Sequence, residues 1–232
     1  MTCDRIDKRG VLATLTIFLF LFSVEFFSLI LSPYMISSGY YAFGREHVSN
    51  PLNALYYMVL ILGFTLFILL TFKKGLKCLV QFILLLTIFV TFYYIFSSFT
   101  FRMFSTLLSL FLTLLLYFRP EWYIIDLTAV ILGAGVGAIL GISLSPLPIL
   151  LLLTILTVYD YISVYRTGHM IALAERIVEI RVPVLFVSPK RKNFSFAKRK
   201  EGEREAYYMG LGDAVLPSTL IVSASVYKCG NM

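Results

Sequence analysis

Long apolar runs, separated by short polar segments, dominate the hydrophobic pattern of this 232-residue chain. A run of about 20 apolar residues is long enough to cross the hydrocarbon core of a bilayer as a helix. The pattern predicts seven such spans, at about 11–31, 53–72, 79–98, 103–118, 124–142, 147–165 and 207–227. We therefore expect an all-α polytopic membrane protein.

Composition supports this class, since only 14% of the residues are charged, whereas soluble domains have about a quarter. We expect one integral membrane domain overall. It divides into a six-span amino-terminal part, 1–165, a cytoplasmic segment, 166–206, and a final part, 207–232, that holds the seventh span. The cytoplasmic segment is predicted to contain a helix at 170–180, a strand-like stretch at 181–187 and a basic, mobile loop at 188–205.

Positive charge is unequally divided between the two sets of loops. Seventeen of the 20 Lys and Arg residues fall on one side, and the short loops alone give 7 against 3. The positive-inside rule therefore places the amino terminus and the 166–206 segment in the cytoplasm of a cell-membrane protein. The net charge of +7 comes mostly from these cytoplasmic Lys and Arg residues. Such a basic face suits anionic lipid headgroups, so the charge requires no nucleic-acid partner.

Few residues could bind a metal or a cofactor. The three cysteines are widely spaced, and His47 and His169 stand alone, so we expect no disulfide framework, no metal and no cofactor. Glycines recur at every fourth position in the fifth span, at Gly133, Gly137 and Gly141. Small residues at that spacing allow close helix approach, and we interpret them as packing.

Four acids lie within or beside the spans, where a charge is costly. Asp126 follows Trp122 and Tyr123, which are typical of a membrane interface, and an acid there suits a helix amino terminus. Glu25 lies deeper, in the first span, and the pattern gives it no partner. The remaining two acids are Asp160 and Asp213.

Asp160 and Asp213 match in depth on neighbouring antiparallel spans. Asp160 is six residues before Arg166, and Asp213 is seven residues after Ala206. At 1.5 Å per residue, both lie roughly 9–10 Å inside the cytoplasmic end. Two carboxylates at one level suggest a pair that shares a proton and acts as general acid and base on a peptide bond. A proton relay in a transporter or channel and a structural hydrogen-bonded pair remain alternatives.

The residues around Asp213 favour peptide hydrolysis. Gly210 and Gly212 leave the backbone lightly covered, as close approach of a substrate backbone requires. Pro217 removes a helical donor and can open the helix locally. An extended substrate needs a strand edge for its backbone groups, and 181–187 is the candidate edge.

"YD" at Tyr159-Asp160 and "GLGD" at 210–213 resemble the motifs of the presenilin and signal peptide peptidase family of intramembrane aspartyl proteases, particularly their archaeal homologues. The resemblance covers about Leu12 to Tyr227. It implies a presenilin-like fold in which Asp160 and Asp213 are the catalytic aspartates, supported by Tyr159, Gly210, Leu211 and Gly212. It also implies that the substrates are transmembrane segments of membrane proteins or remnant signal peptides, and it leaves a homo-oligomer open.

The resemblance further implies nine spans and a Pro-Ala-Leu motif near the catalytic pair. Seven spans are predicted in this sequence, and it contains no Pro-Ala-Leu. An inactive, truncated homologue is therefore a further alternative. A prepilin-type peptidase shares the Gly-x-Gly-Asp motif but takes its other aspartate from an early span, whereas the early acids Asp4 and Asp7 precede the first span here.

Overall fold

The fold is described from a computed structural model, which covers residues 8–42, 52–162, 185–189 and 206–228. The predicted cytoplasmic helix at 170–180 and the basic loop from 190 to 205 lie outside these residues. So do positions 181–184 of the predicted strand.

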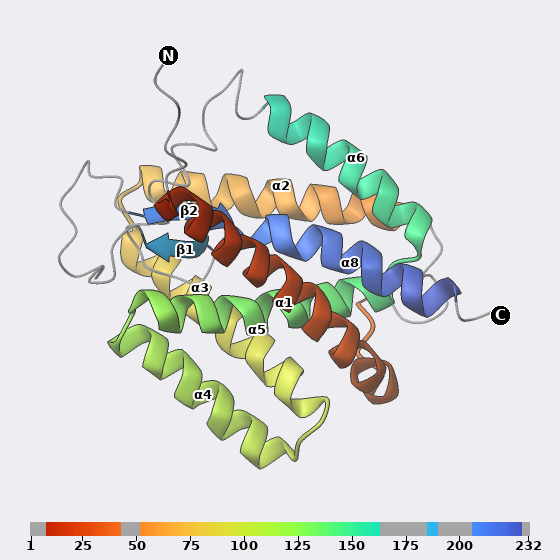
Figure 1. Cartoon of the computed structure of the whole chain (residues 1–232), viewed down its shortest axis with the longest axis horizontal. Helices are drawn as coiled ribbons and strands as arrows, with labels where there is room; N and C mark the ends of the chain where they lie inside the picture. The colour runs from red at the N-terminus through yellow and green to blue at the C-terminus, as the bar shows by residue number, and fades with distance from the viewer. Residues whose placement is uncertain (1–7, 43–51, 163–184, 190–205, 229–232) are drawn as a thin grey trace.

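Seven helices make up most of this part of the chain (Figure 1). They are α1 (Lys8–Ser38), α2 (Leu52–Lys73), α3 (Lys77–Ser97), α4 (Arg102–Phe118), α5 (Trp122–Ser143), α6 (Pro146–Ile162) and α8 (Leu211–Lys228). The seven predicted spans are thereby confirmed as helices. Three segments are long and apolar enough to cross a membrane by length and composition alone: Thr14–Ser38, Cys78–Ser97 and Trp122–Ser143. The other four helices are apolar but shorter by the same measure.

The start of the last predicted span differs from the expectation. Residues Ala206–Gly210 form a strand, β2, and the helix begins only at Leu211. This strand pairs antiparallel with β1 (Leu185–Pro189), with Leu185 opposite Gly210. Pairing with β1 stabilises this strand, and the local residues are compatible with it, because Tyr207 and Tyr208 favour strands and Gly210 disfavours a helix interior. The predicted strand at 181–187 is therefore observed in part, from Leu185 onward.

Helices α1, α5 and α8 pack against one another at the centre of the molecule. The glycines of α5 permit this contact. A Cβ added at Gly133 would lie 3.0 Å from Leu211 Cδ1, and one added at Gly141 would lie 2.6 Å from Val222 Cβ. The corresponding position at Gly137 is occupied by the Ser218 hydroxyl. The packing role predicted for these glycines is confirmed. Residue numbers increase in the same direction along this contact, from Gly133 beside Leu211 to Gly141 beside Val222. The two helices therefore run parallel.

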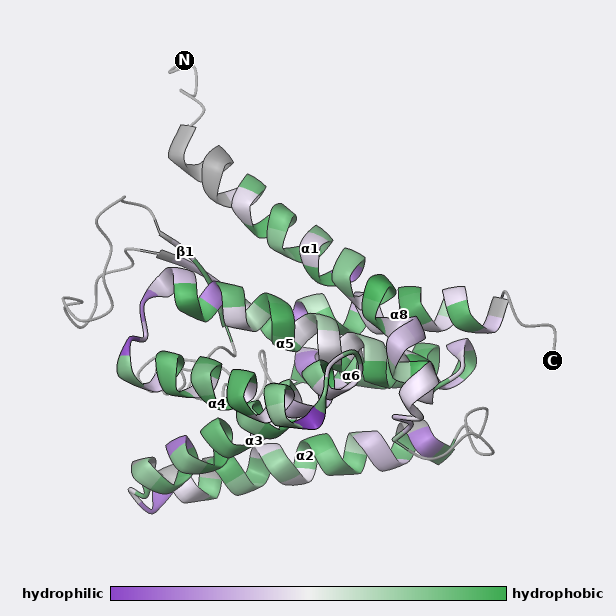
Figure 2. Ribbon diagram, turned by 90° about the horizontal axis from the view of Figure 1, so that it is seen from below, coloured by the Kyte–Doolittle hydropathy of each residue, from purple (hydrophilic) through white to green (hydrophobic). Residues whose placement is uncertain are grey.

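The remaining helices surround this centre. Helices α3 and α4 pack together on one side, and α2 and α6 pack together on another. Most of each helix is coloured as hydrophobic in Figure 2. Several of the most hydrophilic positions lie at helix ends and connections. Many large apolar side chains are exposed, including Phe18 on α1 and Phe111 on α4. Such an apolar exterior suits a lipid surrounding.

Candidate active site

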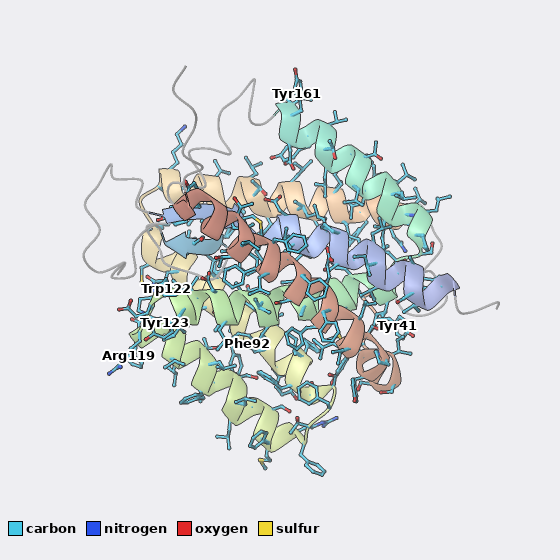
Figure 3. The ribbon with its side chains drawn as sticks, in the orientation of Figure 1. Tyr41, Phe92, Arg119, Trp122, Tyr123 and Tyr161 are labelled. Carbon is cyan, nitrogen blue, oxygen red and sulfur yellow. The ribbon has the colours of Figure 1, made fainter. Side chains whose placement is uncertain are left out.

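The two aspartates lie at the same end of adjacent helices. Asp160 is in the last turn of α6, which ends at Ile162, and Asp213 is in the first turn of α8. Helices α6 and α8 contact each other. The neighbouring Tyr161 stands at the outer end of α6 in Figure 3 and is 66% exposed. Both acids therefore lie at the end of the bundle on the side of the β1–β2 sheet (Figure 1).

The two carboxylates differ in their exposure to solvent. Asp160 is partly buried, and Asp213 is exposed. No hydrogen bond joins the two carboxylates in the part of the chain that the structure describes. Both carboxylates therefore keep solvent-accessible surface.

The glycines before Asp213 differ in their surroundings. A Cβ added at Gly210 would lie 3.3 Å from Asp213 Oδ2, so the carboxylate turns back over the end of β2. A Cβ added at Gly212 would meet nothing within 4 Å. The backbone at Gly212 consequently faces open space beside the acid, as close approach of another chain would require.

Leu211, between these glycines, points into the core. Its side chain packs against Gly133 of α5 and belongs with the cluster around Val24 and Phe186. The next residue after the acid, Ala214, is fully buried. Leu211 and Ala214 thus fix the first turn of α8 on the side opposite Asp213. Helix α8 continues through Pro217 without a break, so the local opening predicted there is not observed.

Tyr159 is half-buried beside Asp160 on α6. Glu25 is half-buried on α1. The role predicted for Tyr159 from its motif stays a prediction.

Asp126 is the residue whose place was not anticipated. The sequence predicts an interfacial acid here, and Trp122 and Tyr123 do lie at the end of α5 near Arg119 (Figure 3). Yet Asp126 is 3% exposed, and its Oδ1 accepts a hydrogen bond from the Val187 N–H at 2.8 Å. Asp126 therefore joins α5 to the sheet that leads into Asp213.

These features define a helical membrane protein with two acids at one end of neighbouring helices. Comparison with known proteins agrees. The family model described as signal-peptide peptidase, presenilin aspartyl protease matches residues 16–232. The chain belongs to this family, and it is a multi-pass membrane protein.

Two solved structures resemble the chain closely. Both are of a presenilin family intramembrane aspartate protease, one in space group C222 and one in P2. The first has a TM-score of 0.65 and 35% identity, and the alignment covers 90% of this chain and 74% of that one. The second has a TM-score of 0.63 and 34% identity, covering 90% and 76%. No curated protein sequence matches the chain significantly.

Proposed function

We propose that this chain is an intramembrane aspartyl endopeptidase, which hydrolyses peptide bonds within transmembrane segments or remnant signal peptides. Asp160 and Asp213 are the catalytic aspartates in this proposal. The observation that carries it is the position of these two acids at the same end of the contacting helices α6 and α8, in a chain that belongs to a family of aspartyl proteases.

The two acids share one proton in the resting pair. The ionised carboxylate takes a proton from a water molecule, whose oxygen attacks the scissile carbonyl carbon. The protonated carboxyl donates its proton to the carbonyl oxygen, giving a neutral tetrahedral diol. The carboxyl that now holds the water proton donates it to the amide nitrogen, and the other carboxylate takes a proton from a diol hydroxyl, so the C–N bond breaks, a carboxylic acid and an amine leave, and the pair again holds one proton. The chemistry needs only carboxylates and water.

The substrate must leave the helical state before it is cut, because helical hydrogen bonds shield its carbonyl groups. We propose that the extended segment adds to the β1–β2 sheet. The outer edge of β1 is occupied at Val187, whose N–H donates to Asp126. The edge at 181–187 that the sequence predicts for the substrate is therefore not the one we propose. The edge of β2 beside Gly210 is the better candidate, because Gly210 lies against Asp213 and Gly212 faces open space.

The charge distribution supports a position in the cell membrane with the amino terminus and the 166–206 segment in the cytoplasm. The site then opens toward the cytoplasmic end of the bundle. Its substrates are single transmembrane segments that reach this level from within the bilayer.

The test is cleavage of a single-span reporter substrate by the purified chain in liposomes, with products identified by mass spectrometry. Asp160→Asn and Asp213→Asn remove the ionisable groups with little change of shape. We expect each to lower kcat by roughly 10²- to 10⁴-fold, the usual contribution of general acid–base catalysis. Glu25→Gln is the matched control, because it removes an acid from a neighbouring helix and should cleave like the parent.

Undiminished cleavage by Asp160→Asn or Asp213→Asn would refute the assignment. The same liposomes also distinguish the transporter alternative. Proton flux that depends on Asp160, in the absence of any cleavage, would replace the protease proposal by a proton pathway.

A further inference from the structure

Asp126 has an unusual environment for a carboxylate inside an apolar helix. It is 3% exposed, and its Oδ1 accepts one hydrogen bond, 2.8 Å from the Val187 nitrogen. Its Oδ2 is also buried and has no hydrogen-bond partner among the described residues. A buried carboxylate with so few donors is unfavourable by itself. A leucine at this position would fit the helix better, so the acid calls for a role outside α5.

The contact of Asp126 is with backbone rather than with a side chain. Val187 lies in the middle of β1, and its own side chain is 2% exposed. The preceding Phe186 is 1% exposed and stacks on Phe20 of α1, with ring centroids 5.2 Å apart. Side-chain packing therefore holds β1 against α1, while the Asp126 hydrogen bond fixes its height along α5.

The sheet transmits this register to Asp213. Leu185 of β1 lies opposite Gly210, the last residue of β2, and Gly210 lies against Asp213 Oδ2. Leu211 packs on Gly133, which is seven residues after Asp126 and so on the same face of α5. One face of one helix thus contacts both the sheet that precedes Asp213 and the helical turn that contains it.

We propose that Asp126 is a positioning residue for Asp213. Its carboxylate oxygen accepts the Val187 N–H and thereby holds the β1–β2 sheet at the height that places Gly210 and the Asp213 carboxylate. The role requires an acceptor atom at Oδ1 and does not require contact with the substrate. The inference rests on the proposed protease function for its activity readout, and on the sheet itself for a second readout.

The experiment compares Asp126→Ala and Asp126→Asn in the full chain in liposomes. Thr128→Val is the matched control, because Thr128 is buried two residues away and its hydroxyl donates only to carbonyls of its own helix. Three quantities are measured: kcat and KM on the reporter substrate, amide hydrogen exchange of the peptide that contains 185–189, and the unfolding midpoint.

Asp126→Ala should speed exchange at Val187 and lower kcat by roughly 10- to 100-fold, as expected for a displaced catalytic group, with little change in KM. Asp126→Asn keeps a carbonyl oxygen at the acceptor position. Its kcat and its rate of exchange at Val187 should therefore stay close to those of the parent. Thr128→Val should change neither kcat nor exchange. If Asp126→Ala fails to fold, Asp126→Leu takes its place, because leucine has nearly the shape of the acid but offers no acceptor for the Val187 N–H; it should show the same faster exchange and lower kcat relative to Asp126→Asn.

Two results would overturn the proposal. One is an Asp126→Ala protein with the kcat and the Val187 exchange of the control. The other is an Asp126→Asn protein that folds and keeps slow exchange at Val187 but has a much lower kcat. In that protein the acceptor still holds the sheet, so the loss of kcat would need another cause. Asp213→Asn separates this outcome from failure of the protease proposal. It should lower kcat by roughly 10²- to 10⁴-fold and leave Val187 exchange unchanged, whereas undiminished cleavage would refute the protease function alone.

Discussion

The contact between α5 and α8 predicts that one added methyl group at Gly141 destabilises the protein. A Cβ there would lie 2.6 Å from Val222 Cβ and 2.9 Å from the Thr219 carbonyl oxygen. The Thr219 oxygen belongs to the backbone, so it cannot turn aside, and α8 must move away from α5. Overpacking of this kind costs about 1–3 kcal/mol, and the better helix propensity of alanine offsets about 0.5–1 kcal/mol of it. For Gly141→Ala we expect a net loss of about 1–2 kcal/mol in the free energy of unfolding.

The assay is unfolding by sodium dodecyl sulfate in mixed micelles, followed by circular dichroism, with Gly63→Ala as the control. Gly63 also lies within a helix, but a Cβ added there would meet nothing within 4 Å. Gly63→Ala should therefore unfold at the same detergent fraction as the parent or at a slightly higher one. The reasoning would be refuted if Gly141→Ala and Gly63→Ala shared one midpoint, because the close approach of α5 and α8 would then be absent.

Four further outcomes are expected. Gly210→Ala puts a methyl carbon 3.3 Å from Asp213 Oδ2, so kcat should fall by roughly tenfold with an unchanged unfolding midpoint, and an unchanged kcat would contradict the contact. Gly212→Ala should fold as well as the parent, since nothing lies within 4 Å; a raised KM would support passage of the substrate beside it, and an unchanged KM would argue against that path. Tyr227→Phe removes a 2.6 Å hydrogen bond to the Ile142 carbonyl and should lower the free energy of unfolding by about 0.5–1.5 kcal/mol in the same detergent titration. Chelation with EDTA should leave reporter cleavage unchanged, and activity that is lost and then restored by a divalent cation would contradict the carboxylate mechanism.

The helices could be predicted from sequence because the bilayer imposes a simple length requirement. Each span must hold enough apolar residues to cross the hydrocarbon core and must satisfy its own backbone groups as a helix. The glycine spacing in α5 likewise has one main physical use, close packing. Gly137 meets Ser218, and Gly141 meets Val222, so the spacing identified the packing face. It did not identify α8 as the partner, because small residues are compatible with several neighbours.

The strand before Asp213 was harder to predict. The run from Tyr207 onward is apolar, and hydropathy alone does not distinguish a strand from the first turn of a helix. The pairing with β1 decides it, and the basic segment 190–205 separates the two strands in the sequence. Such a pairing depends on tertiary contacts, including the burial of Phe186 and Val187. The sequence does carry one local signal, Tyr207 and Tyr208 with a glycine two residues later, which favours a strand that ends at Gly210.

Asp126 shows a different limit of sequence reasoning. Its position after Trp122 and Tyr123 matches an interfacial acid, and both aromatic residues do lie at that end of α5. The error concerns which face of the helix the acid occupies. Asp126, Gly133 and Gly137 share one face, because intervals of four and seven residues return to the same side. Gly133 and Gly137 pack inward, so an acid on their stripe must be buried and needs a donor. Helical periodicity therefore contained the signal for a buried Asp126, but not the identity of its donor, which only the sheet supplies.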